Sequence, residues 1–550
     1  MGVFPDIFTE MAVLLLLAAG VGALCMRLRQ PLIVAFIAVG ILAGPSVLGW
    51  VSANDQIDLL AKFGITLLLF VVGLKLDLHI IRTMGPVALA TGLGQVLFTS
   101  VIGYLIALAL SMTPIAALYV AVALTFSSTI IIVKLLSDKR EVDTLHGRIA
   151  LGFLIVQDLV VVLVMIGLNA LGETGETSVA HGALTVLWKG IAFLVVVVLI
   201  TRYLLPRLLL VLSRSQELLV LFGIAWAVSL AILGDTLGLS KEVGAFVAGV
   251  SLASTPYRDA LGARLVSLRD FLLLFFFIDL GARLDLGMLG AQLGEALVFS
   301  LFVLIGNPLI VMIIMGLLGY RKRTGFLAGL TVAQISEFSL ILGALGLSLG
   351  HIDAEIMGLI TLVGLITICA STYMIIFSYP LYEWLAPWLK IFERQRPHRE
   401  IELGVEPEGG GAEIILFGLG RYGSGIAQVL RGRGARLLSV DYNPDLVSSE
   451  PMGNPVLYGD AEDPEFVASL PLAHVQWVVS TARERQVNQA LIHTLRSLGY
   501  AGRIAVTVHG PGEVARLEQA GADLVLVPLA DAAREAADRI LGQVAPVIPG

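Results

Sequence analysis

The chain has 550 residues, of which 57% are hydrophobic and 14% charged, and its mean hydropathy is +0.89. Soluble globular domains are far more polar than this, so the composition excludes a purely soluble protein and indicates a membrane protein. The two cysteines, Cys25 and Cys369, both lie in apolar segments far apart in the sequence, so a disulfide framework or a metal-binding cysteine cluster is not expected. The formal net charge of −7 is informative only through its distribution along the chain.

Apolar stretches that are long enough to span a bilayer recur from about residue 10 to 386, and we expect thirteen spans. They are predicted at residues 8–26, 31–50, 57–74, 86–110, 113–135, 149–170, 182–205, 215–234, 241–254, 266–282, 291–318, 324–348 and 354–386. Nearly all Lys and Arg residues of the first 400 positions fall in loops on one side. Because positively charged loops stay in the cytoplasm, the N-terminus is predicted to lie outside.

Polar residues interrupt the fifth and sixth predicted spans. The fifth contains ALTFSSTIII, which includes Thr125, Ser127, Ser128 and Thr129. The sixth contains GFLIVQDLVVVLVM, with Gln157 and Asp158 at its centre. A carboxylate in the middle of a membrane helix costs at least about 2.5 kcal/mol on insertion scales, so it usually faces a cavity or a partner. Asp158 is therefore a candidate ion-binding residue, and a structural pairing with a neighbouring helix is the alternative. Gln157 could orient the ion or the carboxylate.

The twelfth predicted span repeats this feature, because TVAQISEFSL places Gln334, Ser336 and Glu337 in an apolar segment. Corresponding breaks in spans 5 and 12 are expected of an inverted repeat of two six-helix units separated by span 7. In transporters of that design, unwound helices meet near the bilayer midplane, and their carbonyls and half-helix ends form an ion site. Asp158 would supply the fixed negative charge of such a site.

A carboxyl group in a dry pocket can bind a proton or a metal cation, whereas holding both is electrostatically unfavourable. Alternating occupancy is the minimal chemistry of a cation/proton exchanger, and a single carboxylate predicts one cation per proton. Other polar residues are candidates for the ion path, namely Asp279, Asn307, Gln334 and Glu337. For Asp279, an ion pair with Arg283 one turn later is an equal alternative.

Two further features are interpreted as structural. Gly40, Gly44 and Gly49 lie in PLIVAFIAVGILAGPSVLG, and we expect them to allow close helix packing. His146 follows a basic stretch between the fifth and sixth spans, and we interpret it as a solvated loop residue.

After residue 386 the composition changes to that of a soluble α/β domain. We predict a transmembrane domain over residues 1–386, a linker over 387–411 and a cytoplasmic domain over 412–550. The last begins with EIILFGLGRYGSG, an apolar strand followed by Gly418-x-Gly420-x-x-Gly423. Further strands alternate with helical stretches, which predicts a doubly wound parallel sheet.

The glycine-rich loop and a later acid are typical of nucleotide binding. Asp441 ends the second strand about 20 residues after the loop, where a ribose-binding acid is expected. The backbone amides at the start of the helix would hold phosphate, and Arg421 is placed to assist. The alternative is a Rossmann-like fold kept only for dimerisation.

Several motifs in order resemble the monovalent cation:proton antiporter-2 family, and its Kef-type potassium/proton branch in particular. They are GILAGPSVLG, LLLFVVGLKLDL, ALTFSSTIIIVKLL, TLHGRIALGFLIVQDLVVVLV, GAFVAGVSLA and AQISEFSLIL. The resemblance implies a homodimer in a prokaryotic inner membrane, in which a dimerisation bundle flanks a core that moves by elevator-like alternating access.

Carried onto this chain, the resemblance implies that Asp158 binds K⁺ (or Na⁺) and the proton. It also implies that Ser127, Ser128 and Thr129 form the break in a crossover helix. Gln157 stands where electrogenic sodium relatives carry a second Asp, which favours electroneutral exchange. The chain departs from many relatives at Asn307, where they carry a basic residue near the ion-site Asp, and at Asp279, where they carry small or neutral residues.

The C-terminal region resembles an RCK, or TrkA-N, domain. The likeness implies that an adenine nucleotide (AMP, ATP or NAD(H)) acts as a regulatory ligand, and that the domain contributes to the homodimer. The implied nucleotide-binding residues are Gly418, Gly420, Arg421, Gly423, Asp441, Asp460 and Ala461. Residues 412 to about 545 leave no room for a separate substrate domain, so we do not expect an enzyme that transfers hydride. We also expect no nucleic-acid partner.

The leading hypothesis is therefore a nucleotide-regulated K⁺/H⁺ antiporter, with a Na⁺/H⁺ antiporter of the same fold as the first alternative. An RCK-gated potassium channel is disfavoured, because a channel needs a carbonyl-lined filter such as TVGYG between two helices and FVVGLKL is the nearest string. A nucleotide sensor with a mere membrane anchor is disfavoured by polar breaks that an anchor does not need.

Overall fold

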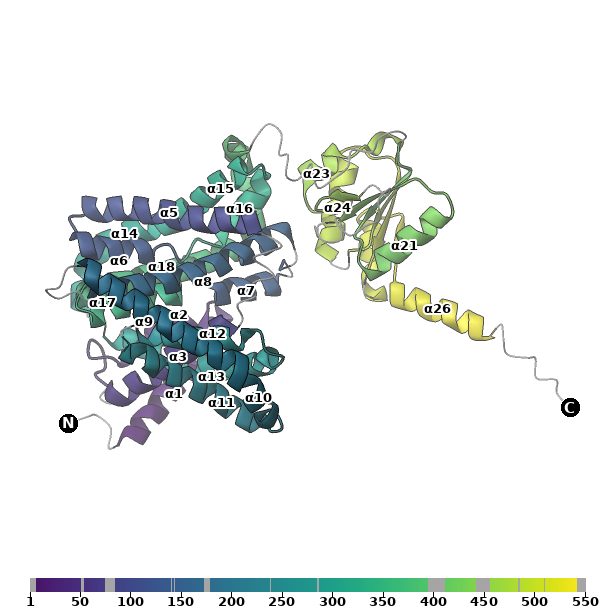
Figure 1. Ribbon diagram of the computed structural model, residues 1–550. Helices are drawn as coiled ribbons and strands as arrows, with labels where there is room; N and C mark the ends of the chain where they lie inside the picture. Colours follow the sequence, from purple (N-terminus) through teal and green to yellow (C-terminus); the bar gives the residue numbers. More distant parts are fainter. Residues whose placement is uncertain are drawn as a thin grey trace. The chain divides into compact units, whose positions relative to one another are not determined.

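The computed structural model describes residues 6–50, 54–74, 85–139, 141–142, 144–172, 179–237, 239–283, 286–393, 411–441, 456–482, 485–508 and 510–541. It contains two compact units, a helical unit that ends at Phe392 and a second unit that includes residues 393–550. Figure 1 shows the helical unit in purple to green and the α/β unit in green to yellow. Most of the predicted linker, residues 394–410, lies outside the described residues, and the predicted domain boundaries stay a prediction.

The helical unit is built from apolar helices, eight of which, among the described residues, are long and apolar enough to cross a membrane. The helices are α1 (Ile7–Arg27), α2 (Leu32–Ala43), α3 (Asn54–Leu74), α5 (Gly85–Ala109), α6 (Pro114–Ala123), α7 (Thr129–Asp138), α8 (Leu145–Gly172), α9 (Val179–Leu199), α10 (Leu205–Leu212), α11 (Gln216–Thr236), α12 (Lys241–Ala253), α13 (Arg258–Ala282), α14 (Leu286–Leu301), α15 (Asn307–Leu317), α16 (Lys322–Leu330), α17 (Glu337–Ser348), α18 (Ala354–Ile376) and α19 (Ser378–Leu389). Single π-helical turns, Ile200–Leu204 and Phe302–Gly306, join α9 to α10 and α14 to α15. The count of thirteen spans stays a prediction, because several apolar helices are shorter than a bilayer requires.

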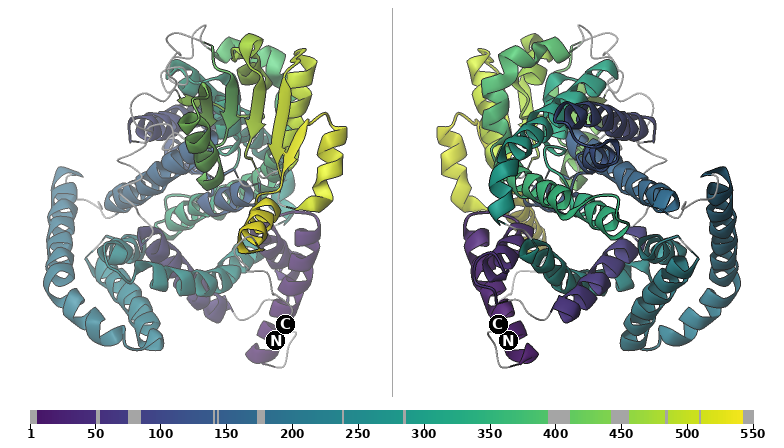
Figure 2. Two further views of the ribbon diagram at one scale, coloured as in Figure 1. Left: turned by 90° about the vertical axis from the view of Figure 1, so that its right-hand side faces the viewer. Right: turned by 90° about the vertical axis from the view of Figure 1, so that its left-hand side faces the viewer.

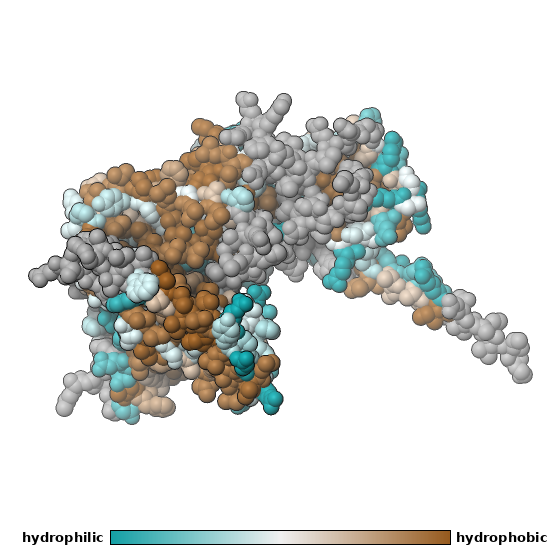
Figure 3. Space-filling model, viewed as in Figure 1, coloured by the Kyte–Doolittle hydropathy of each residue, from teal (hydrophilic) through white to brown (hydrophobic). Residues whose placement is uncertain are grey.

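These helices form two packed groups. In the first, which we call the scaffold bundle (α1–α3 and α9–α13), α13 packs on α2 and α3, and α12 packs on α3 and α11. In the second, the core bundle (α5–α8 and α14–α18), α5 packs on α6 and α15, while α17 packs on α6 and α18. On the face seen in Figure 3, apolar side chains form large patches over this unit. Leu97, Leu105 and Val198 are among the exposed ones, as expected of helices that face lipid.

Glycines set the closest helix contacts of the scaffold bundle. A Cβ on Gly40 would lie 2.2 Å from the carbonyl oxygen of Ile278, and one on Gly44 would lie 2.8 Å from the Cα of Ala282. The predicted close packing is thus confirmed for these two residues, which bring α2 against α13. It is wrong for Gly49, which has open space around it and adopts a positive φ of 60° in the turn after α2.

The turn between α7 and α8 buries a small ionic cluster. Glu141 lies 2.9 Å from the Nζ of Lys139 and 3.2 Å from the Nε2 of His146, and both Glu141 and His146 are less than a tenth exposed. The expectation that His146 is a solvated loop residue is therefore wrong, because the turn folds it back onto Glu141. Burial raises the pKa of Glu141, but the hydrogen bond and charge of His146, together with Lys139, outweigh burial and lower the pKa to about 2.

Replacing Glu141 by Gln is expected to lower the melting temperature at pH 6. The folded-state pKa lies below the ordinary value of 4.5, so the ionised carboxylate stabilises the fold above about pH 4.5, and this stabilisation is lost as the pH falls toward 2. The shift corresponds to about 3 kcal/mol. Melting curves of both proteins in detergent between pH 6 and 3 test this, and a difference that does not shrink with acidification contradicts it.

The second unit is a single parallel sheet with strand order β3-β2-β1-β4-β5-β6, which confirms the predicted doubly wound topology. The strands, drawn as arrows in Figure 2, are β1 (Ile414–Phe417), β2 (Leu437–Asp441), β3 (Val456–Tyr458), β4 (Trp477–Ser480), β5 (Arg503–Thr507) and β6 (Leu524–Leu526). The helices are α21 (Arg421–Gly432), α23 (Pro464–Ser469), α24 (Arg485–Ser497), α25 (Val514–Gln519) and α26 (Pro528–Leu541). The strand order reverses between β1 and β4, and ligands bind at such a switch point.

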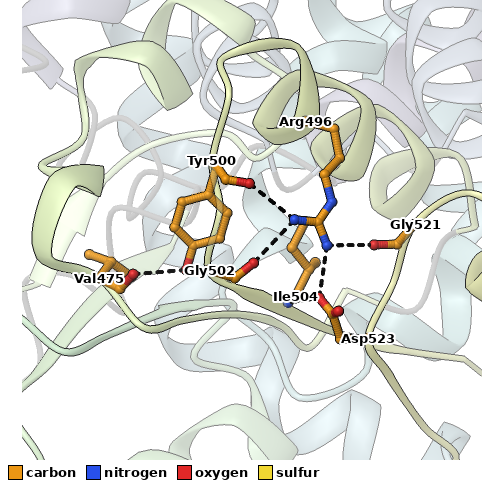
Figure 4. A network of polar contacts seen from close by, with 7 residues as sticks. All are labelled: Val475, Arg496, Tyr500, Gly502, Ile504, Gly521 and Asp523. Carbon is orange, nitrogen blue, oxygen red and sulfur yellow. Dashed lines mark hydrogen bonds and ion pairs between the residues drawn. The ribbon is translucent and has the colours of Figure 1, made fainter.

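A polar network fixes the N-terminal ends of β5 and β6 (Figure 4). Arg496 donates hydrogen bonds from Nη1 to the carbonyl oxygens of Tyr500 and Gly502, and from Nη2 to that of Gly521 and to Asp523. Asp523 in turn accepts a hydrogen bond from the backbone N–H of Ile504, 2.7 Å away. One guanidinium therefore ties the end of α24 to both strands.

Replacing Arg496 by Ala is expected to destabilise the sheet by about 1.5–3 kcal/mol, because three carbonyls and a carboxylate lose a charged donor. Hydrogen exchange at Ile504 in the full-length protein should rise accordingly. Arg516, an exposed residue of α25, provides the control, since Arg516→Ala should leave the exchange unchanged. Equal protection of Ile504 in the Arg496→Ala protein and the wild type would contradict a structural role for the network.

Candidate ion site and nucleotide site

The predicted interruption of the fifth span is confirmed between α6, which ends at Ala123, and α7, which begins at Thr129. Polar side chains in the gap form hydrogen bonds with backbone C=O and N–H groups that a continuous helix would pair with each other. The hydroxyl of Thr125 donates to the carbonyl oxygen of Val122 (2.7 Å), and Ser128 caps α7 by accepting from the N–H of Ile131. The break therefore follows from local sequence chemistry.

The twelfth span is interrupted in the same way between α16 and α17. Ser336 caps α17 and forms a capping box with Ser339, so helix α17 starts at Glu337. The Ser339 hydroxyl also donates to the carbonyl oxygen of Ala123, 2.5 Å away, at the end of α6. The two breaks, more than 200 residues apart in sequence, thus face each other in the core bundle.

Asp158 lies on α8 beside the first break. Its Oδ2 accepts a hydrogen bond from the hydroxyl of Thr129 at 3.2 Å, and the side chain is 8% exposed. Thr129 is the first residue of α7, so the carboxylate is next to a helix N-terminus, where the helix dipole stabilises negative charge. The predicted site residues Asp158 and Thr129 are therefore brought into contact.

Among the residues that the structure describes, the side chain of Gln157 forms hydrogen bonds with the first helix break and with α5, and not with Asp158. Its Oε1 accepts from the backbone N–H of Ser127 (3.1 Å), and its Nε2 donates to the Oε1 of Gln95 (2.7 Å). Gln95, on α5, donates in turn to the carbonyl oxygen of Thr125 and to the hydroxyl of Thr99. Gln95 and Thr99 were not among the sequence candidates, although a glutamine inside TGLGQVLFTS is the same kind of polar interruption that identified Gln157.

Asn307 completes this network between the two breaks. Fully buried at the start of α15, it donates to the carbonyl oxygens of Leu124 (3.1 Å) and Val332 (3.4 Å), one in each break. Its Oδ1 accepts from the hydroxyl of Thr99 (2.9 Å). Asn307 therefore satisfies backbone groups that the interruptions leave open, and no hydrogen bond joins it to Asp158 among the described residues.

Glu337 and Gln334 carry buried polar atoms without hydrogen-bond partners in the described part of the chain, namely both carboxylate oxygens of Glu337 and the Nε2 of Gln334. The hydroxyl of Ser128 and the carboxyl group of Asp158 lie near Glu337. Unsatisfied buried polar groups are uncommon in native structures, and ions or water often explain them. The structure thus groups Glu337 with Asp158.

Asp279 lies elsewhere, near the end of α13 in the scaffold bundle. The Nε of Arg283 donates to its Oδ2 at 2.8 Å, and Arg283 also lies 3.7 Å from Asp58. The observed contacts of Asp279 are those of the alternative prediction, an ion pair with Arg283.

The C-terminal unit places the glycine-rich loop between β1 and α21. Gly418 adopts a φ of 91°, a backbone conformation that favours glycine. A Cβ on Gly423 would lie 1.8 Å from the carbonyl oxygen of Gly418, so this position has no room for a side chain. Gly420 is the N-cap of α21, and Arg421 is its exposed first residue. The free N–H groups at this helix start can hold a phosphate.

The carboxyl ends of the neighbouring strands supply the other predicted residues. Asp441 ends β2 and accepts a hydrogen bond from the N–H of Leu419 in the loop. Asp460 and Ala461 follow β3, and Asp460 accepts from the N–H of Glu462 (2.9 Å). Because parallel strands end at the same edge, all of these residues lie on the side of the sheet where nucleotides bind.

Gly423→Ala is expected to abolish nucleotide binding, because the added methyl group would collide with Gly418. Gly425, on the same helix, is a matched control, since a Cβ there meets nothing within 4 Å. Calorimetric titration of the full-length protein with AMP, ATP and NADH should give binding to the wild type and Gly425→Ala only. Unchanged affinity of Gly423→Ala would exclude this loop as the binding site.

Comparison with known proteins agrees with both units. Residues 12–377 match the family described as "Sodium/hydrogen exchanger, transmembrane", and residues 414–528 match the TrkA-N domain. The "Iron transporter MagA" of Paramagnetospirillum magneticum is 32% identical, with 66% of this chain and 84% of that protein covered. The "Glutathione-regulated potassium-efflux system protein KefC" of Cronobacter sakazakii is 27% identical, with 92% and 80% covered. The helical unit also resembles the sodium proton antiporter MjNhaP1 of Methanocaldococcus jannaschii (TM-score 0.51, 17% identity, 70% of this chain and 97% of that chain covered), which shows the fold.

A helical membrane unit with two helix breaks that face each other, in a chain that also carries a TrkA-N domain, is the arrangement of a secondary transporter. The chain belongs to the sodium/hydrogen exchanger family, as a Kef-type member of the cation:proton antiporter-2 group, and it is a multi-pass membrane protein that exchanges a cation for protons.

Proposed function

We propose that this protein exchanges one K⁺ for one H⁺ at Asp158. The observation that supports this most is the contact of a buried carboxylate with Thr129 at the start of a broken helix, beside the neutral Gln157. An acid in such a place binds either a proton or a cation, and the two compete for one negative charge. With Asp158 alternating between cation and proton, and Glu337 keeping one protonation state throughout, one charge is neutralised in both states and exchange is electroneutral.

K⁺ is the first candidate because the relative KefC carries a potassium-efflux name, and Na⁺ is the second because the fold resembles that of a sodium proton antiporter. Ser127, Ser128 and Thr125 would supply oxygen ligands or shape the site from the same break. Gln334 and Glu337 would line the ion path, with Asn307 holding the breaks in position.

The movement proposed is elevator-like, with the core bundle shifting against the scaffold bundle. All of the polar contacts that link Asp158, Gln157 and the two breaks lie within the core bundle, so the site can move as one body. Homodimerisation through the scaffold bundle and the TrkA-N domain, an inner-membrane location and an external N-terminus belong to the same proposal.

The TrkA-N domain is proposed to bind an adenine nucleotide that regulates exchange. The glycine-rich loop, Asp441 and the residues after β3 supply donors and acceptors for phosphate and ribose at one edge of the sheet. AMP, ATP and NAD(H) all share these groups.

The test uses the purified protein in liposomes that contain a pH-sensitive dye. Adding K⁺ or Na⁺ outside should drive protons out of the lumen, at a rate that an imposed membrane potential of either sign does not change. Dependence of the rate on the potential would contradict electroneutral exchange, and no response to either cation would contradict the transport proposal. Repeating the assay with each nucleotide tests regulation.

A further inference from the structure

Helix α19 follows the last long apolar helix with a single residue between them. Helix α18 ends at Ile376, Phe377 joins the two, and α19 starts at Ser378. One face of α19 is buried against the core bundle, where Ser378 and Leu389 are inaccessible. Tyr382 packs its ring on Phe326 of α16, with the centroids 5.7 Å apart.

Lys139, at the end of α7, fixes this helix. Its Nζ donates to the hydroxyl of Ser378 (2.7 Å) and to the carbonyl oxygen of Ile375 (3.3 Å), and it lies 4.5 Å from the ring centre of Tyr379. The orientation of α19 about its own axis is therefore set by contacts to α7 and α16, so its opposite face is held outward.

That outward face is apolar and aromatic. Trp384 and Trp388 are 69% and 71% exposed, and Phe377 and Ile391, just beyond the two ends of the helix, are 56% and 83% exposed. The spacing of these residues puts them on one stripe. The two indole rings are neighbours, with centroids 5.9 Å apart.

A polar flank lies beside the stripe. Glu383 and Lys390 are both exposed, seven positions apart, and therefore lie on the same side of the helix. The helix thus has three faces, of which one is bound to protein, one is apolar and one is charged. A helix with this pattern lies in the plane of a membrane surface, with Trp at the level of the headgroups.

We propose that α19 is an interfacial helix that binds the bilayer surface through Phe377, Trp384, Trp388 and Ile391, with Lys390 on an anionic headgroup. Two observations favour lipid over another occupant. The stripe continues directly from the end of α18, one of the apolar helices long enough to cross the membrane. A tryptophan pair beside a Lys also matches the boundary between lipid tails and headgroups. This inference goes beyond ion exchange and does not depend on which cation is carried.

Lys139 also connects α19 to the helix that carries the ion-site threonine. Lys139 caps the C-terminal end of α7, and Thr129, the partner of Asp158, is the first residue of the same helix.

The test places the full-length protein in nanodiscs that contain lipids brominated near the headgroup, which quench Trp fluorescence on contact. The difference in fluorescence between the wild type and the double variant Trp384→Phe/Trp388→Phe isolates the emission of these two tryptophans. This emission should be quenched by the brominated lipid. Trp188, which is 70% exposed on α9, gives the positive control, and Trp477 in the α/β unit gives the negative control. If the component from Trp384 and Trp388 is no more quenched than that from Trp477, a second copy, another protein segment or water covers this face, and the proposal is overturned.

A second measurement tests the headgroup. Titrating the detergent-solubilised protein with anionic lipid should shift the emission of Trp384 and Trp388, and Lys390→Gln should move the midpoint about fivefold to higher lipid. A zwitterionic lipid should give no difference between the two proteins. An unchanged midpoint in Lys390→Gln overturns the assignment of Lys390. Both fluorescence readouts are independent of ion transport, so they can support or contradict the interfacial-helix proposal even when the proposed exchange is not observed.

Discussion

Liposomes that contain Asp158→Asn are expected to show no cation-driven proton movement above that of protein-free liposomes. Asparagine keeps the shape of the side chain and can still accept a hydrogen bond from the hydroxyl of Thr129, but it carries neither a negative charge for the cation nor a group that titrates near neutral pH. Because the substituted site is neutral with nothing bound, there is no longer competition between the two ions. The measurement is the initial rate of luminal pH change on adding K⁺ or Na⁺.

Two controls make this result specific. Asp259→Asn removes a carboxylate that is 91% exposed and should exchange at the wild-type rate. The melting temperature of Asp158→Asn should equal or exceed that of the wild type, because a buried charge has been removed. Wild-type exchange by Asp158→Asn would show that the cation binds elsewhere, and a large fall in melting temperature would show that Asp158 has a structural role instead.

Asn307→Leu is expected to destabilise the protein by at least about 3 kcal/mol and to slow exchange more than tenfold. The substitution removes the donor for the carbonyl oxygens of Leu124 and Val332 and the acceptor for Thr99, all within a buried region. Each buried polar group left without a partner costs about 1–3 kcal/mol. Because one carbonyl belongs to each break, the geometry of the ion site should loosen along with the fold.

Ser300→Ala provides the matched control for Asn307→Leu. Ser300 is buried on α14, and its hydroxyl has no hydrogen-bond partner among the described residues, so its removal should lower neither the melting temperature nor the rate. Melting curves in detergent and exchange rates in liposomes distinguish the two variants. If Asn307→Leu melts and exchanges like the wild type, the breaks do not depend on this amide.

Much of the architecture could be predicted because it depends on local chemistry. The length of the apolar stretches indicated membrane helices, and the Ser and Thr residues that interrupt them marked both helix breaks. Gly418, Gly423 and Asp441 indicated the nucleotide-binding type of α/β fold, since only glycine tolerates the positive φ and close approach that the loop requires. These features need no knowledge of distant neighbours.

Contacts between distant segments could not be predicted in the same way. Asn307 was interpreted as a candidate for the ion path at a position where many relatives carry a basic residue, and the structure adds that its amide donates to one carbonyl oxygen in each break. His146 was expected in solvent, but the turn after α7 buries it against Glu141. The side chain alone does not specify its partner, because that depends on which helices the fold brings together.

By itself, the sequence determined that this protein spans a membrane, that a carboxylate interrupts one of its spans and that a glycine-rich α/β domain follows. Only the tertiary structure decided what surrounds Asp158. It places the hydroxyl of Thr129 within hydrogen-bond distance of the carboxylate, and it pairs Gln157 with Gln95 and with the backbone N–H of Ser127. The physical reason is that the free-energy cost of burying a polar side chain depends on the residue itself, so it can be judged from the sequence. The hydrogen bonds that offset this cost come from groups that only the packing of the helices brings close enough.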